Sequence, residues 1–171
     1  MNRLFAALLL SVLPMMAFAA IDETIRLKES VEINAPADKV WSIVGNYGDM
    51  SWHPAIARTE VTEGKAGEVG AKRTLTFKDG GGVKETLTGY DAERMLMKYE
   101  ITEGSLPVRD YGANIRVESA DDGKSVVTWR AMFFRKDPAS PGAPGQDDAA
   151  ARTAIEGVLK SGLENLKKVA E

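Results

Sequence analysis

Two oppositely charged residues, Arg73 and Glu85, occupy positions that the sequence predicts to face inward. Arg73 alternates in phase with Leu75, and Glu85 alternates in phase with Leu87. Because successive side chains of a strand point to opposite faces, each charge shares a face with apolar neighbours. The segment Asp79–Gly82 is typical of a hairpin turn between the two strands. We therefore expect Arg73 and Glu85 to lie opposite or diagonal to each other, within contact range.

An inward-facing Arg–Glu pair is costly unless it is hydrogen-bonded, so its presence needs an explanation. As a functional pair, Arg73 and Glu85 would form the charged floor of a ligand cavity. As a structural pair, they would form an ion pair at the margin of the sheet, or a β-bulge would turn one partner outward. The sequence alone leaves these alternatives open.

Three aromatic residues also share the parity of apolar strand positions, namely Tyr99, Tyr111 and Trp129. Aromatic residues on an apolar face most often belong to the core. Their hydroxyl and indole groups nevertheless need hydrogen-bond partners when they are buried, and a wet cavity containing the Arg–Glu pair would supply them. We therefore predict that these three residues face the same cavity.

The only histidine, His53, lies between Trp52 and Pro54. A histidine that acts as a general base needs an orienting partner and a substrate proton within reach. Asp49 is near in sequence, but a lone histidine in a turn more often caps or packs. We expect no catalytic residue other than the candidate His53, and we include His53 and Trp52 among the predicted ligand-binding residues.

Composition excludes several classes of site. The chain has no cysteine, which excludes disulfides, thiol catalysis, zinc fingers and iron–sulfur ligation. With one histidine and a net charge of −3, we expect no metal site, no cofactor and no nucleic-acid partner. The glycine run Gly80–Gly82 links two predicted strands and lacks the lysine and helix of a phosphate loop. No serine lies in a Gly-x-Ser-x-Gly nucleophile motif.

The first residues resemble a secretory signal peptide. Arg3 provides the positive start, an apolar run follows to Met16, and Ala17–Ala19 is typical of a cleavage site. The apolar run is too short to span a bilayer, although an uncleaved anchor or a buried helix is the alternative interpretation. We predict a cleaved signal peptide over residues 1–19, a single domain over residues 20–171, a periplasmic location and no stable membrane anchor.

The elements that position the candidate residues are mostly strands. Alternating apolar residues between turn-forming segments predict seven of them. Short connections between successive strands indicate antiparallel neighbours. The predicted strands are Thr24–Asn34, Ile56–Glu63, Ala71–Phe77, Val83–Tyr90, Met95–Thr102, Arg109–Glu118 and Ser125–Arg135.

Helices are predicted at two places. Two short helices are predicted after the first strand. The first has Pro36 in its first turn, and the second is Asp49–Ala55, a short turn or helical piece that Pro54 stops. After the Pro/Gly-rich loop Lys136–Gln146, Asp147 or Asp148 caps a long final helix. Its apolar stripe comprises Ile155, Leu159, Gly162, Leu166 and Val169. The predicted fold is α+β, with a seven-stranded, curved antiparallel sheet wrapped around this helix and a cavity between them.

The segment Val31–Trp41 (VEINAPADKVW) resembles the opening of the START/Bet v 1-like superfamily (SRPBCC). The likeness continues through Trp52–Pro54, Gly70–Arg73, Glu85–Leu87, Tyr99–Ile101, Leu106–Val108, Tyr111 and Trp129, and is greatest for the polyketide cyclase/dehydrase-like branch. It implies a helix-grip fold with a hydrophobic cavity. It also implies that Arg73, Glu85, Tyr99, Tyr111 and Trp129 face that cavity and that His53 lies near its mouth.

Three functions follow from the resemblance. The first is an exported, non-enzymatic binding or accessory protein that carries a small hydrophobic ligand or assists a periplasmic dehydrogenase. In its predicted export and in its size, the chain resembles the MxaD-type accessory proteins of methanol oxidation. This resemblance implies methanol dehydrogenase and its cytochrome as partners. The second is a cyclase- or dehydratase-type enzyme that uses His53 or the Arg73/Glu85 pair. The third is a carrier of lipids or other hydrophobic ligands. The superfamily includes binding proteins and enzymes, so the fold leaves the choice open.

Overall fold

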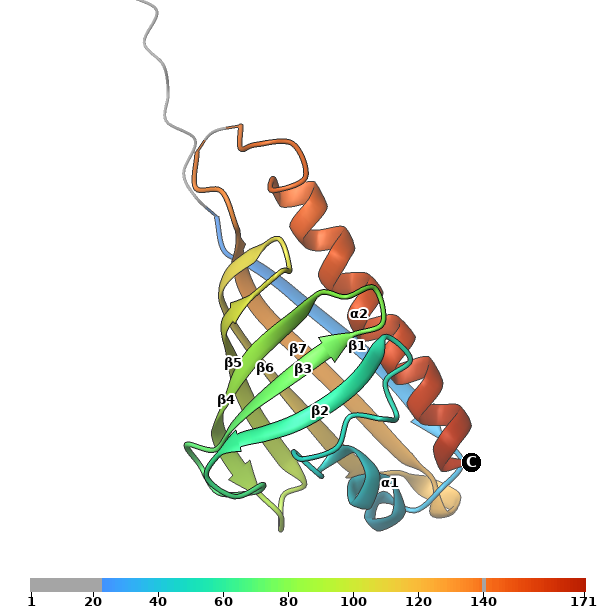
Figure 1. Ribbon diagram of the computed structural model, residues 1–171. Coiled ribbons are helices and arrows are strands. Elements are labelled where there is room, and N and C mark those ends of the chain that lie inside the picture. Colours follow the sequence, from blue (N-terminus) through green and yellow to red (C-terminus); the bar gives the residue numbers. More distant parts are fainter. Residues whose placement is uncertain (1–22, 140) are drawn as a thin grey trace, which may run out of the picture.

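The computed structural model describes residues 23–139 and 141–171. The predicted signal peptide, residues 1–19, lies outside the described residues. Within them, one sheet of seven strands and a long C-terminal helix, α2 (Asp148–Ala170), make up most of the fold (Figure 1). No helix in the described ranges is both long and apolar enough to cross a bilayer.

All strand pairings in the sheet are antiparallel, and its spatial order is β1-β7-β6-β5-β4-β3-β2. Strands β2 to β7 form a meander, because each pairs with the next along the chain, and β1 closes the order beside β7. The fold is therefore the predicted one, with strand ends shifted by one or two residues. The strands are β1 (Ile25–Ile33), β2 (Ile56–Glu63), β3 (Lys72–Phe77), β4 (Gly82–Asp91), β5 (Leu96–Gly104), β6 (Val108–Ser119) and β7 (Ser125–Arg135).

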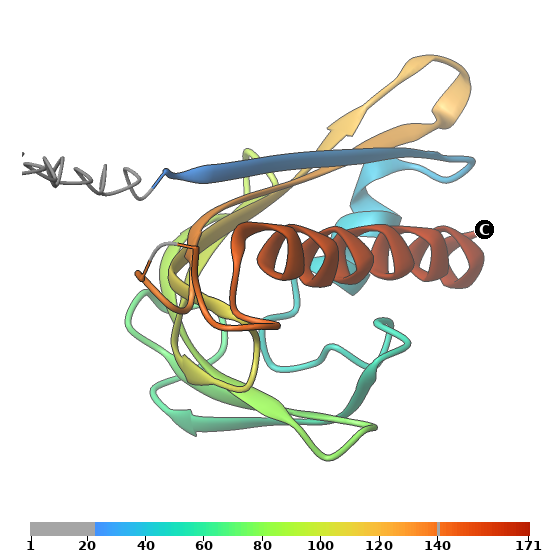
Figure 2. The same ribbon diagram turned by 90° about the horizontal axis from the view of Figure 1, so that it is seen from above.

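The sheet curves around α2, which lies inside the concave face (Figure 2). Alternate residues of each strand point towards the helix, and those of β7 (Val127, Trp129, Ala131 and Phe133) are all buried. On α2, Ile155, Leu159, Gly162 and Leu166 are buried as predicted, whereas Val169 is 49% exposed. Leu163 and Ala170 complete the buried side of the helix instead.

Between β1 and β2 the structure has one short α-helix, α1 (Ala37–Val44), so the prediction of two short helices after the first strand was wrong. The segment from Asn46 to Ala55 consists of turns and bends. The side chain of Asn46 accepts a hydrogen bond from the amide of Gly48, and that of Asp49 accepts one from the amide of Ser51. Such local bonds satisfy the backbone without a helix, and Pro54 prevents one from continuing.

Asp147 caps α2 by accepting a hydrogen bond from the amide of Ala150, as predicted. The Pro/Gly-rich loop before it is held by the buried Arg135, at the end of β7. Its guanidinium donates to the carbonyls of Asp137 and Ala139 and to the carboxylate of Asp148 at 2.8–3.1 Å. The loop is thus tied both to the sheet and to the first turn of α2.

Candidate functional site

A cavity of about 340 Å³, open to solvent beside the exposed residues Pro54, Lys78 and Asp79, lies between the concave face of the sheet and α2. Its walls are mostly apolar and come from six strands, β2 to β7, from α2 and from the turns that precede β2. They include Leu75, Val83, Ile101, Leu106, Ile155 and Val158. A volume just above 300 Å³ is at the lower end of the usual range for small-molecule sites, about 300–1,000 Å³.

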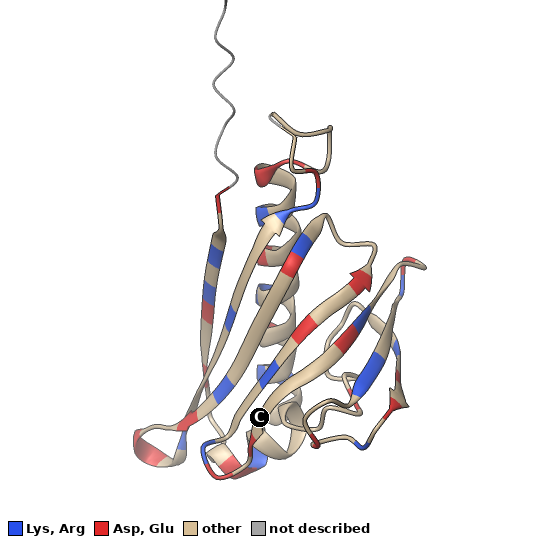
Figure 3. Cartoon of the chain, turned by 90° about the vertical axis from the view of Figure 1, so that its left-hand side faces the viewer, with Lys and Arg blue, Asp and Glu red and all other residues tan. Residues whose placement is uncertain are grey.

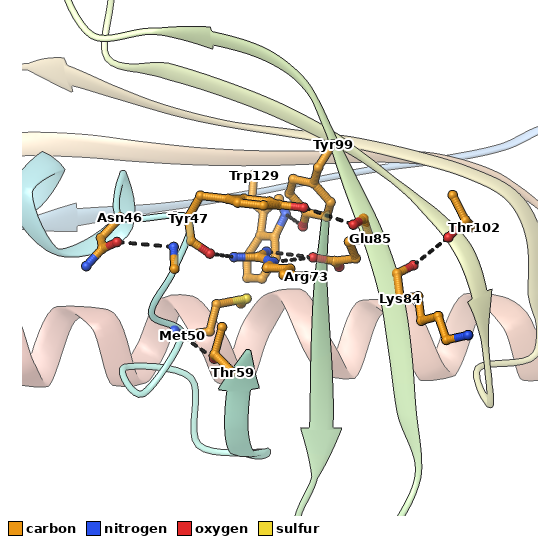
Figure 4. A network of polar contacts seen from close by, with 11 residues as sticks. Asn46, Tyr47, Met50, Thr59, Arg73, Lys84, Glu85, Tyr99, Thr102 and Trp129 are labelled. Carbon is orange, nitrogen blue, oxygen red and sulfur yellow. Dashed lines mark hydrogen bonds and ion pairs between the residues drawn. The ribbon is translucent and has the colours of Figure 1, made fainter. Parts of the chain in front are cut away.

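The predicted pairing of Arg73 with Glu85 is confirmed. The two residues lie directly opposite each other on β3 and β4. The Arg73 Nε and Nη2 atoms both contact Glu85 Oε2, at 2.7 and 2.6 Å (Figure 4). Both side chains are at least 95% buried, and Glu85 lines the cavity while Arg73 lies behind it.

Tyr47, which the sequence did not single out, completes this ion pair. Its carbonyl accepts a hydrogen bond from Arg73 Nη1 at 2.7 Å, and its hydroxyl donates to the backbone carbonyl of Glu85 at 3.1 Å (Figure 4). The guanidinium carbon of Arg73 lies 4.2 Å from the centroid of the Tyr47 ring. Tyr47 lies in an irregular segment, where no periodicity signals which side chains are buried.

The second polar group of the cavity wall consists of aromatic residues. Trp129 Nε1 donates to the hydroxyl of Tyr99 at 2.9 Å (Figure 4). The rings of Tyr99 and Tyr111 lie 6.4 Å apart, and all three residues line the cavity, as parity predicted. Burial raises the pKa of Tyr99 and of Tyr111 well above the ordinary value for tyrosine. Both hydroxyls therefore stay protonated at neutral pH and can donate hydrogen bonds.

Burial also raises the pKa of Glu85, and the nearby Arg73 guanidinium opposes that effect. The Glu85 carboxylate in turn raises the pKa of Tyr99 and Tyr111 through its charge, which places these three groups in one electrostatic cluster. Apart from this cluster, the mostly apolar lining includes the polar residues His53, Lys78 and Asp79.

Both ring nitrogens of His53 are engaged with backbone groups. Nε2 lies 3.0 Å from the carbonyl oxygen of Val158 on α2, and Nδ1 accepts the amide of Ala55 at 3.2 Å. These partners require a neutral ring with its proton on Nε2, and burial lowers the pKa of His53. His53 lines the cavity, but no ring nitrogen is free to act as a base in this arrangement.

The approach of α2 to His53 depends on Gly162. A Cβ atom at this position would lie 2.6 Å from His53 Cδ2 and 2.8 Å from Trp129 Cζ3. Trp52 packs against the same cluster, with ring centroids 5.8 Å from those of both His53 and Trp129. Trp52 is buried but does not line the cavity.

Of the seven predicted ligand-binding residues, five line the cavity: His53, Glu85, Tyr99, Tyr111 and Trp129. The other two, Arg73 and Trp52, support them from behind. Whether these residues bind a ligand remains a prediction. Among the described residues, no group of three or more His, Cys, Asp or Glu side chains is placed to hold a metal ion.

The inward-facing Arg135 was missed as a buried charge, although its parity with Phe133 could have indicated it. Lys78, in the turn after β3, was also missed. It lines the cavity, and its charge contributes to lowering the pKa of His53.

Several solved structures have the same fold. A protein from Thermobifida fusca, with 26% sequence identity and a TM-score of 0.70, aligns over 85% of this chain and 92% of its own. The protein XoxI from Bacillus cereus (24% identity, TM-score 0.71) aligns over 84% of this chain and 94% of its own. Norcoclaurine synthase from Thalictrum flavum (21% identity, TM-score 0.65) aligns over 95% and 98%, respectively. At these identities the last two show the fold alone.

No curated protein matches the sequence significantly. The profile of one family, described as polyketide cyclase / dehydrase and lipid transport, matches residues 24–171, which is nearly all of the chain that the structure describes. The chain therefore belongs to the polyketide cyclase/dehydrase and lipid-transport family and has the helix-grip fold of the Bet v 1-like superfamily.

Proposed function

We propose that this protein binds a small, largely apolar molecule in the cavity between the sheet and α2, without transforming it. The observation that carries the proposal is an apolar cavity whose one histidine has both ring nitrogens occupied by backbone groups. Burial of an apolar molecule there would supply the binding free energy.

The polar cluster on one wall would orient the ligand. Tyr99 and Tyr111 keep their protons at neutral pH, so the ligand would place an acceptor oxygen or nitrogen towards these hydroxyls. Arg73 and Tyr47 hold Glu85, so its carboxylate is positioned before a ligand arrives. Polar groups that are already held in place lose little conformational entropy when a ligand binds. They also allow the site to distinguish between ligands of similar size.

Native mass spectrometry of the protein purified from its own host tests the proposal most directly. We expect a bound small molecule that is lost from Ile101→Trp, because an indole at this cavity-lining position fills the space. Val169→Trp is the control, since Val169 is exposed on α2 and does not line the cavity. An empty wild-type protein that also fails to bind anilinonaphthalene sulfonate, an anionic dye that reports hydrophobic sites, would refute the proposal. Recovery of a membrane lipid would make the protein a carrier.

Export and an accessory role belong to the same proposal. The N-terminal sequence supports secretion to a periplasm. The likeness to MxaD suggests that the partners are a periplasmic methanol dehydrogenase and its cytochrome. Co-purification from a periplasmic extract tests this partnership. Normal methanol oxidation in a deletion strain would contradict it without affecting ligand binding, which is measured separately.

A cyclase- or dehydratase-type enzyme is the second candidate function. One observation favours it: Glu85 is buried, lines the cavity beside two protonated tyrosines, and has a pKa that burial raises. In that case Glu85→Gln would abolish turnover of the recovered ligand. Binding without chemical change in the wild type would instead support the binding protein.

A further inference from the structure

The outer face of the sheet carries four exposed cations on neighbouring strands. They are Arg26 and Lys28 on β1, Arg130 on β7 and Lys98 on β5, together called the cationic patch below. Lys28 lies opposite Arg130, Arg130 opposite Asn114, and Asn114 opposite Lys98. Three of the charges therefore form one row across four strands. Figure 3 shows the outer face with its basic residues in blue.

The cationic patch differs from the other basic residues of the outer face. Lys72 pairs with Glu63 at 2.7 Å, Lys84 with Glu103 at 2.7 Å, and Arg116 with Glu118 at 3.2 Å. Among the described residues, no carboxylate forms an ion pair with any of the four cations of the patch. Like charges directly opposite each other, such as Lys28 and Arg130, destabilise a sheet. The four cations lie together although the net charge of the whole chain is −3.

The cationic patch surrounds a hollow of about 630 Å³ in the outer face. Gly112 lies in it and has no side chain to fill it, since a Cβ atom there would meet nothing within 4 Å. The β6–β7 pairing shifts register between Arg109 and Gly112, which marks a β-bulge beside the hollow. Met132, 48% exposed, supplies an apolar contact, and Glu100 is the single carboxylate in the lining.

We propose that the cationic patch and its hollow form a docking surface for an acidic, protruding segment of a partner protein. Four cations against one carboxylate favour Asp- and Glu-rich segments, and the hollow favours a strand or loop that projects into it. A flat bilayer surface would touch the rim but would not fill the hollow. Two copies of this chain meeting face to face here would bring like charges together.

The docking surface is independent of the cavity, because the two lie on opposite faces of the sheet. Its variants leave every cavity-lining residue unchanged, so failure of one proposal does not imply failure of the other. Binding through exposed charges weakens as salt increases, whereas occupancy of the apolar cavity does not depend strongly on salt.

A fluorescently labelled oligo-glutamate peptide tests the surface, with fluorescence anisotropy of the full domain at low and high salt. We expect binding that high salt weakens and that the double variant Lys28→Glu/Arg130→Glu weakens by about tenfold or more. The control Lys39→Glu/Lys168→Glu changes the net charge equally at exposed positions elsewhere, and should bind like the wild type. Circular dichroism and thermal unfolding check that each variant is folded.

Three results would overturn the proposal. The first is no binding of the peptide by the wild type at low salt. The second is an equal loss in the control, which would make net charge the cause. The third is binding to anionic phosphatidylserine vesicles but not to the peptide, which would assign the patch to a membrane. Should the double variant not fold, Arg130→Glu alone serves, because it places a carboxylate opposite Lys28 and relieves repulsion.

Discussion

Charged side chains are paired on the inner face of the sheet, whereas those of the cationic patch on the outer face are unpaired among the described residues. On the inner face, Arg73 and Glu85 are buried, in direct contact and further bonded to Tyr47. On the outer face, Lys28 and Arg130 lie opposite each other and both are exposed. The inner charges are satisfied within the protein, so removing one leaves the other unpaired in an apolar environment. The outer charges repel each other and would gain from an external anion.

The difference separates charge that organises the fold from charge that is available to a partner. A buried ion pair whose charges are hydrogen-bonded within the protein positions a cavity wall. It attracts charged molecules only weakly, because its two charges largely cancel. An unpaired exposed group contributes little to stability but gives a surface its specificity. Arg73→Met on the inner face and Arg130→Glu on the outer face test this distinction directly, and changes at Gly162 and His53 test the packing of the inner side.

The largest effect is expected for Arg73→Met, which leaves the Glu85 carboxylate buried without its cation. We expect a loss of about 3–5 kcal/mol in the free energy of unfolding, measured by urea denaturation. Lys72→Met, which breaks the exposed pair with Glu63, should cost about 0.2–1 kcal/mol. The double variant Arg73→Met/Glu85→Leu should be more stable than Arg73→Met alone. Similar losses for Arg73→Met and Lys72→Met would remove the distinction between the faces.

The next largest effect is expected for Gly162→Ala on the inward side of α2. Its Cβ would clash with His53 and Trp129, and we expect a loss of about 1–3 kcal/mol from the shift that follows. Gly157→Ala in the same helix is the matched control, because its Cβ would meet nothing within 4 Å. It should stabilise the protein by about 0.5–1 kcal/mol. Thermal unfolding compares the two, and equal effects would contradict the close packing of α2.

A smaller effect is expected from acid. Burial lowers the pKa of His53 below the ordinary 6.5, so the folded protein holds the ring neutral and the unfolded chain binds the proton first. Its contribution to stability is therefore present above pH 6.5 and is lost as pH falls towards the folded pKa. The slope is at most about 1.4 kcal/mol per pH unit. His53→Gln should flatten this part of the stability curve, and an unchanged slope would contradict a buried neutral histidine.

The smallest effect is expected for Arg130→Glu on the outer face. It replaces a repulsive pair with an attractive one opposite Lys28, and should raise the free energy of unfolding by about 0.2–1 kcal/mol. Arg116→Glu, which breaks the pair with Glu118, should lower stability by a similar amount. Chemical denaturation at low salt resolves both. A loss of stability in Arg130→Glu would show that the patch has a structural role.

Parity along the strands predicted much of the cavity wall. Arg73 and Glu85 were placed on one face and within reach of each other because alternation within a strand is local geometry, and a short hairpin limits the register. The second short helix failed because side-chain bonds of Asn46 and Asp49 favoured turns, a competition that apolar periodicity does not register. Tyr47 was missed because it lies in this irregular segment, where apolar periodicity does not indicate which side chains are buried.

The sequence by itself determined the seven strands, the inward parity of Glu85, Tyr99, Tyr111 and Trp129, and the capped final helix, because each depends on residues close together in the chain. Only the tertiary structure decided the hydrogen-bond partners of His53, since Val158 is 105 residues away in the sequence and α2 packs closely against His53 at Gly162. It also decided that Lys28, Lys98 and Arg130 form one row. Such contacts depend on the register between strands and on the position of α2 against the sheet, and both are set by the packing of the whole domain.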